Sequence, residues 1–169
     1  MPLSSTLAVA AFTELSQAAG LGTGKVPVGL SRSATLGSGT GAGKADKVYQ
    51  ARRTIAASGT DDLDLAGVLT DAFGASITFA RVKGLFIAAS AANTNNVVIG
   101  NAATNAWATL LNATGTVTLR PGAVLAAIAG SADPTTYGVT ASTGDILRLA
   151  NSAGGSTVTY DICIVGASA

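Results

Sequence analysis

The sequence of 169 residues contains no histidine and a single cysteine, Cys163. Without histidine the chain lacks the commonest general base, every histidine-containing catalytic triad and most kinds of zinc site. One cysteine can form neither an internal disulfide nor a thiolate metal cage. Cys163 follows apolar residues with no basic neighbour that would activate it, so we expect a buried, inert thiol.

Carboxylates are also scarce, and Glu14 is the only glutamate. The one carboxylate cluster is Asp61-Asp62-Leu63-Asp64. Its alternation with Leu63 and Leu65 favours a strand whose solvent face carries Asp62 and Asp64, and a cation site is the alternative. The glycine-rich run 37–44 lacks the Ser or Thr that a phosphate loop needs after its lysine, so it favours a tether. We therefore expect no enzyme, no cofactor and no metal.

Charged residues make up only 11% of the chain, against roughly 25% in an average soluble protein. Hydrophobic residues reach 48% but aromatic residues only 5%, so most of the apolar content is small side chains. A weakly charged surface loses little hydration energy when a neighbour covers it, which favours a protein docked permanently to others. The net charge of +1 argues against nucleic-acid binding, and no apolar run approaches the roughly 18 residues of a membrane span.

The few charges are unevenly placed. Residues 1–53 hold six basic residues against two acidic ones, whereas residues 54–169 hold four against seven. A basic leading segment on a mildly acidic body is typical of a docking arm. The candidate partner-binding residues are Lys25, Arg32, Lys44, Lys47, Arg52 and Arg53. For Arg52 and Arg53, the alternative to contact with a partner is that both side chains are solvated on an edge strand.

The residue composition and patterning divide the chain into two parts. Residues 1–45 are predicted to be an N-terminal arm, and residues 46–169 a β-sandwich domain. Apolar residues at helical spacing predict a short amphipathic helix over 4–19. Glycine and serine dominate 20–43, which predicts a flexible segment, because glycine loses the most backbone entropy on ordering. Leu7–Phe12 is apolar, but no basic residue precedes it and Glu14 interrupts it, so we expect synthesis in the cytoplasm without export.

Ten short apolar segments, separated by turn residues, predict an all-β, antiparallel, jelly-roll-like sandwich. The last has the clearest alternation, with Val158, Tyr160, Ile162 and Ile164 predicted to face the core. In 76–89 the parity changes, so a bulge or bend near Ala80-Arg81 is needed for Ile77, Phe79, Val82 and Phe86 all to face inward. The predicted strands are 48–57, 62–66, 76–89, 96–100, 107–111, 116–120, 124–129, 137–140, 145–150 and 157–165.

Trp107 is the only tryptophan. We expect it to fill the core between the two sheets, and a stacking platform for carbohydrate is the alternative.

Four stretches resemble small structural proteins of tailed phages. They are Val48–Ala56 (VYQARRTIA), Asp62–Gly74 (DLDLAGVLTDAFG), Thr78–Ile87 (TFARVKGLFI) and the ending that runs from Gly144–Asn151 (GDILRLAN) to Tyr160-Asp161-Ile162. The likeness covers residues 48–168 and leaves the arm unmatched. It implies a virion component at the capsid surface, a decoration (cement) protein whose partners are the major capsid protein and copies of itself. It supplies no catalytic residue.

Two other functions stay open. A receptor- or glycan-binding domain of a tail fibre would use Trp107, Tyr137 or Tyr160 as stacking surfaces. A neck, tail or baseplate subunit would differ from a decoration protein in its copy number per particle.

Overall fold

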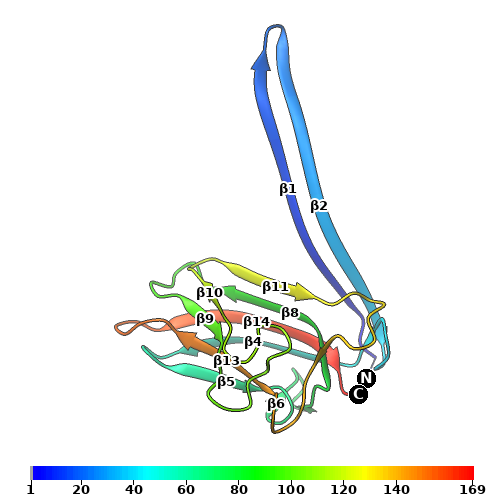
Figure 1. The fold of residues 1–169 in the computed structure, drawn as a ribbon, viewed down its shortest axis with the longest axis vertical. Helices are drawn as coiled ribbons and strands as arrows, with labels where there is room; N and C mark the ends of the chain where they lie inside the picture. The colour runs from blue at the N-terminus through cyan, green and yellow to red at the C-terminus, as the bar shows by residue number, and fades with distance from the viewer. Residues whose placement is uncertain (1) are drawn as a thin grey trace.

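A computed structural model describes residues 2–169, and every regular element in that range is a β-strand. Two parts are visible in Figure 1: a β-sandwich and a long hairpin that stands away from it. The hairpin consists of β1 (Ser5–Ala19) and β2 (Gly22–Ser38), and β2 adds a short parallel pairing with β3 (Lys44–Ala45) at its base. The all-β prediction is confirmed.

The sandwich is built from two antiparallel sheets. One has the strand order β11-β8-β14-β4, with β12 also paired to β8, and the other has the order β10-β9-β13-β5. A small pair, β6 and β7, completes the body. The bounds are β4 Lys47–Ile55, β5 Thr60–Asp64, β6 Leu69–Thr70, β7 Ser76–Ile77, β8 Arg81–Ala89, β9 Val97–Gly100, β10 Thr116–Leu119, β11 Val124–Ile128, β12 Tyr137–Gly138, β13 Ile146–Asn151 and β14 Val158–Ala167.

Alternation along the strands builds the main core between the sheets. On β14 the side chains of Val158, Tyr160, Ile162 and Ile164 are all buried in this core, as the sequence predicts. They meet inward-facing residues of the other sheet, such as Leu149 and Ile99. A residue pointing inward is followed by one pointing outward, because successive side chains of a strand lie on opposite faces.

The predicted helix over 4–19 is wrong, because these residues form strand β1. Leu7, Val9, Ala11 and Leu15 recur at alternate positions of this strand, although Phe12 lies on the opposite face. Strand β2 lies in register beside β1 from Ser5↔Leu36 to Ala19↔Gly22. The glycine-rich 22–38 is likewise a regular strand, whose backbone groups pair with β1. A two-residue turn, Gly20-Leu21, joins the strands, and Gly20 supplies the positive φ that such a turn requires.

Two details of the body also differ from prediction. Segment 107–111 is not a strand but a turn, closed by a hydrogen bond from the Asn112 N–H to the Ala108 carbonyl. The predicted break near Ala80-Arg81 is confirmed, since 76–89 divides into β7 and β8. Phe86 nevertheless faces outward, because the pairing of β14 with β8 slips by one residue at Lys83 and leaves Leu85 and Ile87 facing the core.

Candidate docking surface

The sheet that contains β14 has a second face, which points away from the main core. We call it the outer face. Its side chains are Val48, Gln50, Arg52 and Thr54 from β4; Thr159, Asp161, Cys163 and Val165 from β14; Gly84, Phe86 and Ala88 from β8; and Val124, Ala126 and Ile128 from β11.

The base of the hairpin covers one end of the outer face. Leu7, Leu36, Ala45 and Val165 form a small buried cluster there, separate from the main core, and we call it the seat. Half-buried Val48, Phe86, Ile128 and Cys163 pack against the seat from the outer face, and Leu3 packs from the chain's beginning. The hairpin is thus fixed to the sandwich by apolar contacts at its base.

Gly84 is the reason that the seat can form. A Cβ atom at this position would lie 2.5 Å from the Leu7 Cδ1 atom, which is too close for any contact between carbons. Because the β8 backbone is bare at Gly84, the Leu7 side chain can pack directly against the sheet. Leu7 is consequently only 5% exposed although it belongs to a two-stranded hairpin.

Lys83 holds the loop that leads from the hairpin into β3. Its side chain is only 2% exposed, and its Nζ atom donates hydrogen bonds to the backbone carbonyls of Gly41 (2.5 Å), Lys44 (2.5 Å) and Thr40 (3.4 Å). Burial lowers the pKa of Lys83, and neighbouring Arg81 adds to this effect. A buried ammonium that donates to carbonyls of one loop fixes the conformation of that loop, because releasing it would leave buried polar groups unpaired.

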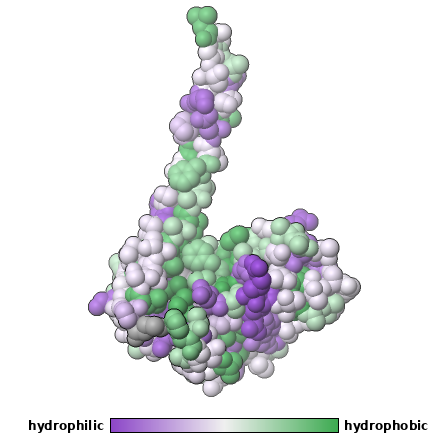
Figure 2. All heavy atoms as spheres, turned by 180° about the vertical axis from the view of Figure 1, so that it is seen from behind, coloured by the Kyte–Doolittle hydropathy of each residue, from purple (hydrophilic) through white to green (hydrophobic). Residues whose placement is uncertain are grey.

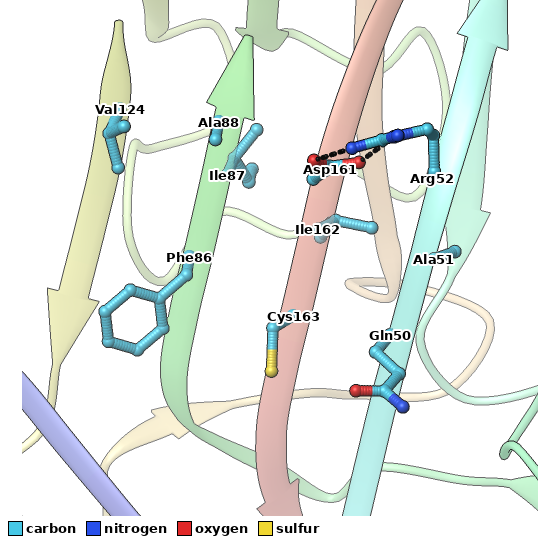
Figure 3. A pocket seen from close by; sticks show the side chains of 10 residues that line it. All are labelled: Gln50, Ala51, Arg52, Phe86, Ile87, Ala88, Val124, Asp161, Ile162 and Cys163. Atoms are coloured by element: carbon cyan, nitrogen blue, oxygen red, sulfur yellow. Dashed lines mark hydrogen bonds and ion pairs between the residues drawn. The ribbon is translucent and has the colours of Figure 1, made fainter. Parts of the chain in front are cut away.

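Beyond the seat, the outer face is an uncovered groove of about 530 Å³. Figure 3 shows Phe86, Cys163 and Gln50 side by side across β8, β14 and β4. Further along the groove, Arg52 donates two hydrogen bonds to the Asp161 carboxylate, at 2.7 and 2.8 Å. Since Phe86 and Cys163 also touch the seat, the groove continues the surface on which the hairpin base already lies.

The hairpin itself has one apolar face and one polar face. The face that buries Leu7, Ala34 and Leu36 at the base continues outward with exposed aliphatic side chains. They include Leu15 and Val28, which are 74% and 58% exposed. Figure 2 shows apolar residues gathered where the hairpin meets the sandwich and recurring along the hairpin to its tip. We define the apolar hairpin face as Val9, Ala11, Leu15, Val26, Val28 and Leu30.

The opposite face of the hairpin is more polar, although it also carries the exposed ring of Phe12, beside Gly29. Cross-strand pairs there include Ala8 with Ser33, Ala10 with Ser31 and Ser16 with Lys25. Lys25 also forms an exposed ion pair with Glu14, with 2.8 Å between Nζ and Oε1. Period-two alternation in both strands therefore produces an amphipathic ribbon.

The six predicted partner-binding residues do not form one cluster. Lys25 lies near the hairpin tip on its polar face, whereas Arg32 lies beside Val9 on the other face. Lys44 and Lys47 belong to β3 and the start of β4, at the hairpin base. Their role in binding a partner stays a prediction.

Arg52 and Arg53 point to opposite faces of β4. Arg52 lies on the outer face, while Arg53 makes two hydrogen bonds to Asp61, at 2.6 and 2.7 Å, where the two sheets meet. The Tyr160 hydroxyl donates to the same carboxylate at 2.8 Å. Burial opposes ionisation of Asp61, but the hydrogen bonds from Arg53 and Tyr160 outweigh it and hold the pKa of Asp61 below its ordinary value.

The remaining predicted side chains also have defined positions. Trp107 is buried, as expected; its Nε1 atom donates to the Gly138 carbonyl at 2.8 Å, and its ring lies edge-on to Tyr137. Asp62 pairs with Arg148 on neighbouring β13, while Asp64 accepts from the Ala66 N–H. Cys163 is half-buried on the outer face rather than fully buried, and burial raises the pKa of its thiol.

No family model matches this chain. No curated protein and no solved structure matches it either. Within residues 2–169, no three His, Cys, Asp or Glu side chains lie close enough to hold a metal ion. The same range forms no helix long and apolar enough to cross a bilayer.

The apolar hairpin face and the groove did not emerge from the sequence as candidates. A signal for the hairpin face is present: Val26, Val28 and Leu30 occur at every second position. The intervening glycine, proline and serine residues obscured that signal, because they are typical of loops. The groove had no signal of its own, since only the pairing of distant strands brings its lining residues together.

Proposed function

We propose that the chain is a structural assembly protein of a tailed-phage virion, and specifically a capsid decoration (cement) protein. The observation that supports this best is the hairpin, which stands off the sandwich with its apolar face exposed. Exposed aliphatic side chains in a contiguous row mark a surface made for a partner. The resemblance of residues 48–168 to tailed-phage structural proteins gives the proposal its setting.

The strand order of the body favours a jelly roll. Following the chain, β4, β8, β11 and β14 belong to one sheet and β5, β9, β10 and β13 to the other, so the chain repeatedly crosses between the sheets. In the orders β11-β8-β14-β4 and β10-β9-β13-β5, the first and last sandwich strands, β4 and β14, are neighbours. Double-sheet jelly rolls of eight strands are common in viral capsid proteins.

In this proposal residues 1–45 are the arm that contacts neighbouring molecules. Basic residues on the arm and at its base, such as Lys25, Lys44 and Lys47, attract an acidic patch of the major capsid protein. The apolar hairpin face and the weakly charged sandwich surface supply the short-range contacts. Several modest contacts on a rigid lattice raise the effective concentration of each one, so that a lost contact is quickly remade.

The tail-fibre alternative has less support from the geometry. Trp107 and Tyr160 are both buried, so neither offers an exposed ring for a sugar to stack on. Tyr137 is half-buried and its ring is engaged with Trp107. The neck, tail or baseplate alternative differs from the proposal only in where the molecule is placed.

The first experiment is a count of the chain in purified virions by mass spectrometry, relative to the major capsid protein. A decoration protein is expected at a copy number comparable with that of the capsid protein. A handful of copies per particle would assign it to the neck or tail, and absence from the particle would refute a virion role.

The second experiment shortens the hairpin without disturbing the seat. Residues 11–30 are removed, and Ala10 is joined to Ser31 through an Asn-Gly turn, which leaves Leu7 and Leu36 in place. We expect this variant to keep the native Trp107 emission but to fail to co-sediment with heads that lack the chain. Co-sedimentation equal to that of the full chain would disprove the role of the hairpin.

A further inference from the structure

We infer that the partner of the apolar hairpin face is the groove on the outer face of a second copy of this chain, so that copies assemble by exchanging hairpins. This inference rests on the proposed function, in which the arm contacts neighbouring molecules, and it names a second copy as one such molecule and the two surfaces that meet. Each molecule would donate its hairpin once and accept a hairpin once.

The first argument is continuity between the two surfaces. The outer face already binds a hairpin of this sequence, because the seat is the contact between the hairpin base and that face. The groove extends the same apolar strip through Phe86 and Cys163. The hairpin likewise extends the same apolar face beyond Leu7. Both halves of a matching contact are therefore present on one chain and left uncovered.

The second argument is that one molecule cannot bring its own two surfaces together. Leu7, Ala34 and Leu36 are buried at the hairpin base, and Lys83 fixes the loop that follows it. These contacts direct the rest of the hairpin away from the sandwich, as Figure 1 shows. To reach its own groove the hairpin would have to leave the seat and expose it. A second copy can cover both the apolar hairpin face and the groove while the seat of each molecule stays intact.

The third argument is the area available. The apolar hairpin face presents on the order of 500 Å² of apolar surface, as much as the largest patch on a typical monomer. An exchange covers a hairpin and a groove on each copy, which amounts to on the order of 2,000 Å² for the pair, enough for a stable dimer. Small side chains such as Ala88 and Ala126 on the outer face allow a ribbon to approach closely.

The fourth argument is charge. The face of the hairpin that carries Val9 also carries one charged residue, Arg32, at the base, and its guanidinium donates a hydrogen bond to the Ser31 carbonyl. In the groove the two charged side chains are Arg52 and Asp161, which neutralise each other. Covering the groove therefore leaves no charge without a partner. Burial is most costly when it leaves a charge unpaired.

The experiment begins with the mass of the full chain in solution, measured by light scattering on a size-exclusion column. We expect the unmodified protein to be oligomeric at tens of micromolar, because interfaces of standard size have dissociation constants between roughly micromolar and picomolar. Val28→Asp on the apolar hairpin face, and Val124→Asp in the groove, should each reduce the mass toward that of a monomer. Ser31→Asp, which places the same charge on the polar hairpin face, should leave it unchanged.

Mixing the two defective variants tests exchange directly. The Val28→Asp protein keeps an intact groove and the Val124→Asp protein keeps an intact hairpin, so a mixture should form a complex that neither forms alone. A monomeric unmodified protein, an oligomer that survives both substitutions, or a mixture that stays monomeric would each overturn the inference. Native Trp107 emission from both variants shows that the sandwich stays folded, and the Ser31→Asp variant controls for the effect of an added charge on the hairpin.

A cysteine series gives an independent readout through Cys163, the only native cysteine. Single cysteines are placed along the apolar hairpin face, at Val9, Val26, Val28 and Leu30, and on the polar face at Ser31 and Ser33. With an added copper oxidant to accept the two electrons, at least one apolar-face cysteine should form a disulfide with Cys163 of another copy. Covalent dimers from the polar-face cysteines alone, or from neither face, would contradict exchange.

These results are separable from the fate of the proposed function. If the protein exchanges hairpins but is absent from virions, the proposed virion role is refuted and the inference of hairpin exchange is supported. If the protein is monomeric but abundant on virions, the virion role is supported and hairpin exchange is refuted. The partner of the hairpin would then be the major capsid protein.

Discussion

Substituting Leu7 by alanine should release the hairpin from the sandwich without unfolding the sandwich. Leu7 packs in the seat, which shares no buried residue with the main core. Truncating a buried leucine costs about 2–5 kcal/mol. The seat is small and bordered by half-buried side chains that can relax, so we expect the lower end, about 2–3 kcal/mol. That cost raises the population of the undocked hairpin roughly 30- to 140-fold.

Hydrogen exchange measures this population at two amides beside the hairpin base, whose protection we expect to depend on docking of the base. The Gly39 N–H donates to the Ala45 carbonyl, and the Asp46 N–H donates to the Gly166 carbonyl, each at 3.1 Å. In Leu7→Ala these amides should exchange faster by the factor above, while Trp107 keeps its native emission. Val9→Ala is the matched control, because Val9 is the next residue outward on the same face and is already 44% exposed. Its effect should stay below about threefold.

Two outcomes would refute this reasoning. If exchange at Gly39 and Asp46 changes no more in Leu7→Ala than in Val9→Ala, the seat does not hold the hairpin. If Leu7→Ala loses the native Trp107 emission at room temperature, the seat and the main core are one cooperative unit.

Three further substitutions test single contacts. Asp61→Asn should cost about 2–3 kcal/mol in urea unfolding, because Arg53 then keeps its charge without a carboxylate. The lowered pKa of Asp61 contributes stability above about pH 4 that is lost as the pH falls through the folded-state value, so the variant should show a flatter acid profile. Asp62→Asn, in a more exposed pair, should cost less than about 1 kcal/mol. Lys83→Met should cost about 2–3 kcal/mol and abolish exchange protection in the 39–44 loop; unchanged protection would show that the loop holds itself.

The body of the protein was largely readable from the sequence, because period-two alternation and turn residues are local signals. The last strand is the clearest case, since all four of its predicted core residues are buried. Phe86 shows the limit of such reading. A slip of one residue at Lys83 reverses every side chain that follows, and the need for it arises only when β8 pairs with β14.

The prediction of a helix over 4–19 is wrong for a different reason. In 5–19, alanine and leucine fit both a helical and a strand repeat, and alanine favours the helix. Residues 5–19 form a strand rather than a helix because β2 pairs with them. The glycine, serine and proline residues of β2 are typical of a flexible linker, so its sequence does not indicate a strand. Strand formation in both segments depends on their pairing, so neither can be assigned alone. The candidate site depends on that hairpin, and for this reason the sequence indicated an arm but not its apolar face.

A ribbon of two strands has no interior strand, and this has a consequence for handling the protein. Along its outer rim β1 pairs with no other strand, and it carries no proline that would remove a donor. β2 does carry one, Pro27, and its rim is therefore interrupted. Strand-by-strand growth into fibres should accordingly begin at β1 when the purified protein is concentrated or stored, and a proline introduced there would be the first measure to improve its shelf life.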